Sequence, residues 1–167
     1  MSDITIRRAL QADLAALLAI YNHYVLTTPI TFDLKPRTLA ERQVWFDTFA
    51  PAGRYQCFVA VADGAPVGWA SSGRFREKAA YDTSVEMSVY LAPALQRKGL
   101  GHRLYATLFA ALAGEDIHRA YGGITLPNAG SVGLHEAFGF TCIGIQREVG
   151  RKFDKFWDVA LYERSMS

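Results

Sequence analysis

The sequence has few cysteines and no long apolar run. Its two cysteines, Cys57 and Cys142, lie far apart, and neither belongs to a Cys-x-x-Cys pair. Because zinc sites and disulfide frameworks need closely patterned cysteines, neither is indicated, and two core thiols are expected. Charged residues interrupt the N-terminal stretch before any apolar run reaches the length of a signal peptide or a membrane span. We therefore expect a cytoplasmic protein with no membrane partner.

An excess of one charge is also absent. The chain carries 18 Lys and Arg against 16 Asp and Glu, and the basic residues are spread along its length. A nucleic acid is therefore not expected as the main partner, although a local anion site is allowed. Half of the 167 residues are apolar, which is enough for one core. With no repeat or linker, residues 1–167 are expected to form a single domain.

The spacing of apolar residues predicts a chain that mixes helices and strands. Helices are expected over residues 11–24, 38–49, 99–112 and 131–138. Strands are expected over residues 3–8, 55–62, 66–75, 83–91, 120–126, 140–148 and 155–163. The Asp63-Gly64 pair suits a tight hairpin turn between the second and third strands. This order is typical of an α+β domain with a mixed sheet.

The strand expected over residues 83–91 has two unlike faces. Alternation places Val85, Met87, Val89 and Leu91 on an apolar face, and Ser84, Glu86, Ser88 and Tyr90 on the other. Pro93 cannot donate a ladder hydrogen bond and therefore ends the strand. A carboxylate is thus expected on the more polar face of a strand whose other face is apolar.

A glycine-rich basic loop, residues 96–102, connects this strand to the next helix. Free N–H groups and the helix dipole make such a helix start a good anion site. Gly99 and Gly101 let an anion approach the main chain, and Arg97, Lys98 and His102 add positive charge. The pattern lacks the Gly-Lys-Ser/Thr of a P-loop and the full Gly-x-Gly-x-x-Gly of a dinucleotide site. A pyrophosphate is the anion that suits it best.

At this loop the chain resembles the GNAT acetyltransferases, whose signature Gln/Arg-x-x-Gly-x-Gly/Ala matches residues 96–101. Within that superfamily it is similar to the phosphinothricin and methionine-sulfone N-acetyltransferases. The motifs that carry this resemblance are IYNHYV, Thr31-Phe32, ERQxWF from Glu41, FRxxxAYxxxVExSVY from Phe75, PNxxSxxLHExxGF from Pro127, and the segment Trp157 to Val159. They span nearly the whole chain.

The resemblance implies a three-layer fold, with a mixed sheet that is splayed between its fourth and fifth strands and flanked by helices. Acetyl-CoA would lie in the gap, and no metal would take part. Cofactor contacts are implied for Val89, Tyr90, Leu91, Gln96, Arg97, Lys98, Gly99, Leu100, Gly101, His102, Asn128 and Ser131. Relatives of this kind are commonly homodimers.

Acetyl transfer to an amine needs a group that takes a proton, because an α-amine titrates near roughly pH 8. Glu86 is the candidate base, directly or through water. By resemblance, His135 occupies the place where many relatives carry a tyrosine near the cofactor sulfur, so it is the candidate acid. Each has a plain alternative: a solvated strand glutamate for Glu86, and a structural helix histidine for His135.

An anionic group on the acceptor would need cations and a pocket wall. Arg74, Arg76 and Lys78 precede Tyr81 on the segment that leads to Glu86, and Phe32 is a further candidate wall residue. An ordinary solvated edge is the alternative reading of the three cations. Many relatives carry an arginine where this chain has Lys78, so a bidentate contact to an oxyanion is altered there.

The expected activity is therefore acetylation, by direct transfer from acetyl-CoA, of the α-amine of a small amino-acid-like molecule of the phosphinothricin or methionine sulfoximine and sulfone class. A peptide or protein N-terminus is the alternative acceptor. A covalent acyl-enzyme on Cys57 or Cys142 has no neighbouring activating group in the sequence. A non-catalytic, dimeric CoA-binding module ranks last, because both a candidate base and a candidate acid are present.

Overall fold

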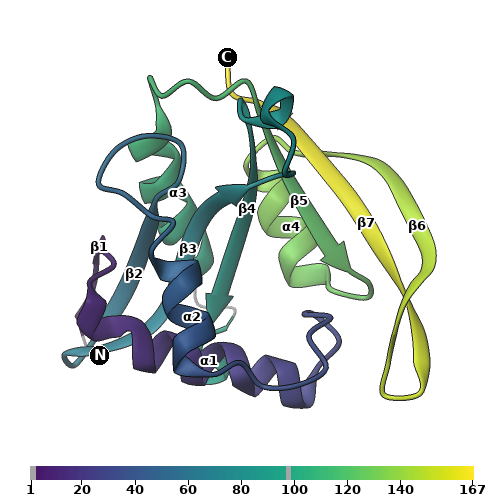
Figure 1. The fold of residues 1–167 in the computed structure, drawn as a ribbon, viewed down its shortest axis with the longest axis horizontal. Helices are drawn as coiled ribbons and strands as arrows, with labels where there is room; N and C mark the ends of the chain where they lie inside the picture. The colour runs from purple at the N-terminus through teal and green to yellow at the C-terminus, as the bar shows by residue number, and fades with distance from the viewer. Residues whose placement is uncertain (1–2, 97–98) are drawn as a thin grey trace.

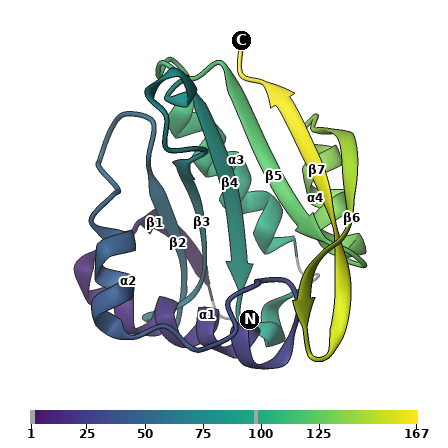
Figure 2. The same ribbon diagram turned by 45° about the vertical axis from the view of Figure 1, so that its right-hand side comes forward.

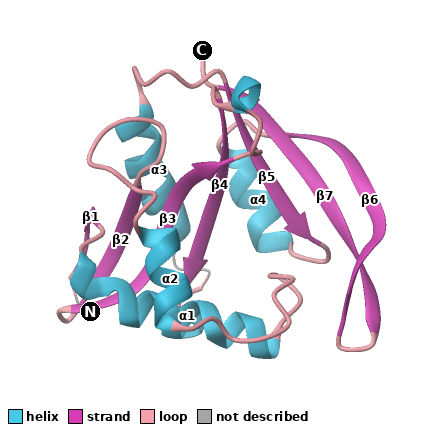
Figure 3. Ribbon diagram, in the orientation of Figure 1, coloured by secondary structure: helices cyan, strands magenta, loops and turns pink. Residues whose placement is uncertain are grey.

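The protein folds around one mixed sheet of seven strands with helices on both faces (Figures 1 and 3). The computed structural model describes residues 3–96 and 99–167. The strands are β1 (Ile4–Arg8), β2 (Cys57–Ala62), β3 (Ala65–Arg74), β4 (Ser84–Leu91), β5 (Arg119–Thr125), β6 (Thr141–Lys152) and β7 (Lys155–Ser165). The helices are α1 (Leu14–Thr27), α2 (Leu39–Phe46), α3 (Leu100–Leu112) and α4 (Ala129–Ala137), with short 3-10 turns η1 (Gln11–Asp13), η2 (Ala79–Tyr81) and η3 (Pro93–Leu95). Their order confirms the α+β prediction.

The helices divide into two pairs that cover opposite faces of the sheet (Figures 1 and 2). Helices α3 and α4 cover the main core, in which Leu104 and Leu108 meet Val85 and Met87 of β4. Helices α1 and α2 cover a smaller aromatic core around Trp69 of β3. The result is the expected three-layer arrangement.

The sheet opens between two neighbouring strands. Its order is β1-β2-β3-β4-β5-β7-β6, and all neighbours are antiparallel except β4 and β5. These two parallel strands pair only from Ser84 to Glu86, opposite Arg119 to Tyr121, and then diverge (Figure 2). Residues 87–91 therefore have a ladder partner on the β3 side alone. The predicted splay is confirmed, and Glu86 lies in its last pair.

The two tight hairpins differ in how easily their sequences reveal them. Asp63 and Gly64 both have positive φ angles, 49° and 78°, as the predicted turn requires. The β6–β7 hairpin turns at Phe153 and Asp154, whose φ angles are 53° and 55°. A phenylalanine rarely adopts this conformation, so the turn carries no sequence signal and β6 runs beyond its expected end at 148. Within the described residues, no helix is long and apolar enough to cross a membrane.

Candidate active site

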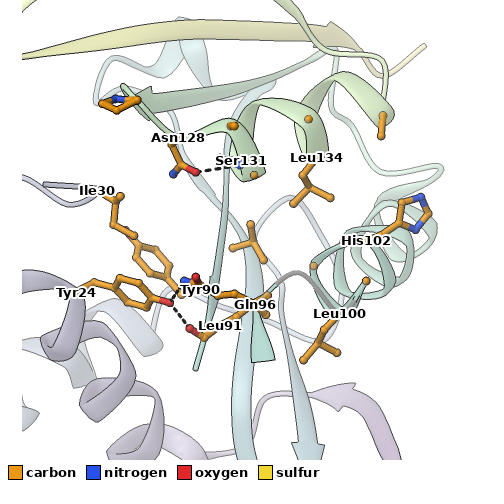
Figure 4. Close-up of a pocket in the computed structure, with 18 residues that line it drawn as sticks. Tyr24, Ile30, Tyr90, Leu91, Gln96, Leu100, His102, Asn128, Ser131 and Leu134 are labelled. Atoms are coloured by element: carbon orange, nitrogen blue, oxygen red, sulfur yellow. Dashed lines mark hydrogen bonds between the residues drawn. The ribbon is translucent and has the colours of Figure 1, made fainter. Parts of the chain in front are cut away.

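A cavity of about 630 Å³ lies in the gap that the splay opens (Figure 4). Its walls come from the end of β4, the start of α3, and the segment that leads from β5 into α4. The lining residues are Tyr24, Ile30, Val89, Tyr90, Leu91, Gln96, Gly99, Leu100, Gly101, His102, Pro127, Asn128, Ala129, Gly130, Ser131, Gly133, Leu134 and Ala137. The structure thus brings together the cofactor residues that the sequence suggested, apart from Arg97 and Lys98, which lie outside the described residues.

One end of this cavity is the N-terminus of α3. Gly99 precedes the helix with a φ of 73°, in the left-handed region where glycine carries no Cβ penalty. A helix leaves its first N–H groups without partners inside the helix, and they carry the positive end of its dipole. Gly101 and His102 follow in the first turn and also line the cavity. This end can hold a phosphate or pyrophosphate.

The opposite wall begins at Asn128, which caps α4. Its side-chain oxygen accepts a hydrogen bond of 3.1 Å from the backbone N–H of Ser131. Gly130 and Gly133 place no side chain on this wall, and a Cβ on Gly133 would meet no atom within 4 Å. The space in front of the wall is therefore open. Asn128 and Ser131 therefore shape the wall of the cavity through the helix start that they form.

Tyr24 ties three parts of the site together, and the sequence did not point to it. Its hydroxyl donates to the carbonyl of Leu91 and accepts a 2.6 Å hydrogen bond from the side-chain amide of Gln96 (Figure 4). The end of α1 is thereby fixed to the end of β4 and to the loop. In the sequence Tyr24 is one residue of the IYNHYV motif, and its role could not be seen there because its partners lie about seventy residues away.

Glu86 borders a second cavity of about 470 Å³ on the α2 face of the sheet. The other lining residues are Trp45, Thr48, Phe49, Tyr55, Ser71, Gly73, Arg74 and Ser88. The Glu86 side chain is accessible to solvent, as suits a group on the floor of an open recess. The surrounding protein still removes much of its hydration, and this desolvation raises the pKa of the carboxyl group. A raised pKa makes the carboxylate a stronger base once it is ionised.

Of the three candidate substrate cations, only Arg74 is among the residues that line this second cavity. Arg74 lines it beside Glu86 and is 3.3 Å from Asp82 in an exposed ion pair. Arg76 lies over the rings of Phe75 and Tyr81 at 4.9 and 5.1 Å, and its Nη1 donates to the Tyr81 hydroxyl at 3.3 Å. Both arginines are exposed and therefore available to an anion.

Like Arg76, the candidates Lys78 and Phe32 lie outside this lining. Lys78 precedes η2 and is exposed. Phe32 lies against Gly150 of β6, so close that a Cβ there would be 2.2 Å from its ring. Beside it, the buried Lys152 amine donates a 2.8 Å hydrogen bond to the carbonyl of Thr31. The loop that carries Phe32 is thus anchored to the β6–β7 hairpin.

The structure does not bring His135 to either cavity lining. Only 3% of the residue is exposed, and burial lowers the pKa of its imidazole. Its Nδ1 lies 2.8 Å from the carbonyl of Ser131, and its Nε2 lies 3.1 Å from the Tyr105 hydroxyl. The ring also fills the space above Gly122, where a Cβ would be 2.7 Å away. Both nitrogens are therefore occupied within the core, which favours the structural alternative over the acid.

A helix start suited to a pyrophosphate, an open strand edge and a carboxylate at the point of divergence are features that suit a group-transfer enzyme with a phosphate-bearing donor. Residues 17–140 match the model of the Acetyltransferase (GNAT) family, and the chain belongs to that family. It is an N-acetyltransferase.

Three individual acetyltransferases are similar to this chain over nearly its whole length. Over 167 residues the chain is 48% identical to a phosphinothricin N-acetyltransferase from Streptomyces coelicolor, covering 99% of this chain and 98% of the relative. It is 36% identical to an L-methionine sulfoximine/L-methionine sulfone acetyltransferase from Pseudomonas aeruginosa, with coverage of 97% and 94%. A Salmonella typhimurium acetyltransferase solved with acetyl-CoA superposes with a TM-score of 0.90 at 33% identity, covering 98% of this chain and 94% of the other.

Proposed function

We propose that this enzyme transfers the acetyl group of acetyl-CoA directly to the α-amine of a small amino-acid-like acceptor of the phosphinothricin or methionine sulfoximine and sulfone class. The observation that carries the proposal is the place of Glu86. Its carboxylate borders the second cavity at the last β4–β5 pair, where the gap that forms the first cavity begins. The names of the two relatives above support the acceptor class.

The residues of the first cavity fit acetyl-CoA. The start of α3 and Gly99 to His102 would hold the pyrophosphate, and the unpaired edge of β4 at Val89 to Leu91 would face the pantetheine arm. Because Gly130 and Gly133 carry no side chains, the wall that they form leaves room for an elongated molecule. When bound, acetyl-CoA supplies an acetyl group activated as a thioester.

Glu86 removes the proton that keeps the acceptor amine from reacting. A free α-amine is largely protonated at neutral pH, and a carboxylate with a raised pKa accepts that proton directly or through a water molecule. The amine nitrogen then bonds to the acetyl carbon as the carbon–sulfur bond breaks, and the second proton that the nitrogen gives up passes to the departing thiolate or to solvent. A thiol with a pKa near roughly 8.5 leaves as a thiolate without strong acid help. The reaction therefore does not require His135 as an acid.

Arg74 and Arg76 would bind the anionic groups of the acceptor. Both are exposed on the segment that leads from β3 to β4, and Arg74 shares a cavity with Glu86. Guanidinium groups suit carboxylate, phosphinate and sulfone oxygens because they donate two parallel hydrogen bonds. Lys78, Tyr81 and Phe32 would complete the acceptor side from the surrounding loops. Free amino acids carry the carboxylate that a peptide acceptor lacks at this position.

We also propose that the enzyme is a cytoplasmic homodimer. The edge strand β6 and its hairpin expose a row of apolar side chains that a second copy would cover: Ile143, Ile145, Val149, Phe153 and Phe156. Cys57 and Cys142 are free thiols, as is usual in a reducing compartment, but only Cys57 is the buried core thiol that the sequence predicts, because Cys142 is exposed on the edge strand β6. Light scattering of the wild type and of Ile145→Lys should show a dimer that the substitution weakens, and a wild-type monomer would refute the assembly.

The proposal is tested by measuring CoA release with a panel of acceptors. The panel contains phosphinothricin, methionine sulfoximine, methionine sulfone, ordinary amino acids, polyamines and short peptides. We expect turnover to be selective for the first three compounds. Preferential turnover of peptides would instead establish the alternative acceptor class, and CoA binding without any turnover would establish a non-catalytic module.

A further inference from the structure

Gly123 lies beside the Glu86 carboxylate, on the β5 side of the splay. It pairs with Leu161 of β7, whereas its other edge faces the gap, because β4–β5 pairing ends at Tyr121. A Cβ on Gly123 would be 3.9 Å from Oε1 of Glu86 and 3.7 Å from Cγ1 of Val159. Gly123 is exposed although it lies within an interior strand of the sheet. Its missing side chain therefore leaves space beside the carboxylate oxygen.

The fold itself does not require a glycine at this position. At the neighbouring Gly122, a Cβ would be only 2.7 Å from the His135 ring, so that glycine is a packing necessity. The two contacts at Gly123 are ordinary van der Waals distances, and its φ angle is not in the left-handed region. A glycine inside a strand is less stable than alanine by roughly 0.5–1 kcal/mol. Packing therefore offers no reason for the glycine at 123.

A second glycine borders Glu86 on the opposite side. Gly73 of β3 is the antiparallel partner of Glu86 and lines the same cavity. A Cβ there would meet only the Glu86 carbonyl oxygen, at 4.0 Å. Gly73 also has no φ in the left-handed region. Glu86 thus has a neighbouring strand position without a side chain on each side within the sheet: Gly73 of β3 and Gly123 of β5.

We propose that Gly123 and Gly73 determine acceptor specificity by keeping two spaces beside Glu86 open for the substituents on the carbon that bears the reacting amine. The inference rests on the proposed function and deepens it. An α-amino acid carries both a carboxylate and a side chain on that carbon, so its amine reaches the base only if there is room on both sides. A simple primary amine has no such need.

The test uses Gly123→Ala and Gly73→Ala, with Gly144→Ala in β6 as the matched control. A Cβ on Gly144 would meet no atom within 4 Å, and this residue lines neither cavity. Steady-state constants are measured at pH 8 with the best amino-acid acceptor of the wild type and with the smallest amino acid that it accepts. Thermal melting is recorded for every variant.

An added methyl group in a fitted pocket typically changes specificity by at least tenfold. We expect each site variant to raise the KM of the larger acceptor by about tenfold and that of the smaller acceptor by less. The KM for acetyl-CoA should not rise and the melting temperature should not fall. Gly144→Ala should match the wild type. Unchanged acceptor constants in both site variants would overturn the specificity role, as would equal losses for both acceptors. A wild type that acetylates no amino acid would instead refute the proposed function.

Discussion

The two cavities of this enzyme are lined by different kinds of chemical group. The first cavity, which we propose for the donor, is lined by the end of β4, the start of α3 and the segment that leads from β5 into α4, and four of its lining residues are glycines: Gly99, Gly101, Gly130 and Gly133. The second cavity, which we propose for the acceptor, is lined mainly by side chains of α2 and the segment after it, of β3 and of β4. A backbone site accepts a ligand shared by the whole family, whereas a side-chain site can change its acceptor by single substitutions. Substitutions on the two sides should therefore affect different kinetic constants.

Glu86→Gln is expected to have the largest effect. The amide cannot accept a proton, so kcat/KM for the acceptor should fall by about 10² to 10⁴, the usual contribution of a positioned base. The KM for acetyl-CoA should stay near its wild-type value, because Glu86 is outside the first cavity lining. Steady-state kinetics with both substrates varied makes the measurement. Glu77→Gln, at an exposed carboxylate outside both linings, is the control.

Gly101→Val should produce the opposite pattern. A branched side chain in the first turn of α3 would crowd Leu134, already 3.4 Å from a Cβ position, and would fill space meant for the donor. We expect the KM for acetyl-CoA to rise on the order of tenfold, about 1.4 kcal/mol, with the acceptor KM little changed. Ala106→Val, on the exposed side of the same helix, controls for helix propensity. Equal changes in both constants would remove the distinction between the two sides.

His135→Leu should affect stability more than turnover. It leaves the Tyr105 hydroxyl without its partner, so the free energy of unfolding should fall by about 1–3 kcal/mol. Because the folded pKa is lowered, the unfolded chain binds the proton more readily, and the wild type should lose stability as the pH falls below roughly 6.5. The variant should lack this histidine component. Urea unfolding at pH 7.5 and 5.5 tests both effects, whereas a large loss of kcat in a stable variant would restore the acid role.

Tyr24→Phe should have the smallest effect. Loss of the hydroxyl removes the hydrogen bonds to Leu91 and Gln96. Each lost bond should lower the free energy of unfolding by about 1 kcal/mol. The KM for acetyl-CoA should rise a few-fold, because the end of β4 and the loop lose their common anchor. Thermal melting and donor kinetics measure these changes. Thr27→Ala, in the last turn of the same helix, distinguishes the hydroxyl bridge from a general weakening of α1.

The sequence predicts the cofactor side better than the acceptor side, and the difference has a physical cause. Gly99 and Gly101 lie at the start of α3, within a few residues of each other. A local sequence motif is therefore enough to predict how they are arranged. Alternation along β4 also placed Glu86 on the correct face. His135 could not be placed in this way, because the burial of a side chain on the short helix α4 depends on packing against Tyr105 of α3. The place of Gly123 beside Glu86 depends on where β4 and β5 diverge, which the sequence does not show.

The most direct test of the account is the pH dependence of kcat/KM for the acceptor in wild type and Glu86→Gln. Below its pKa Glu86 is protonated and cannot act as a base, so wild-type activity should fall in an acid limb that lies above the ordinary glutamate value of 4.5. The acceptor amine adds its own limb in both proteins. We predict that only the wild type shows the second, carboxylate limb. The same profile in both proteins would contradict the assignment of Glu86 as the base.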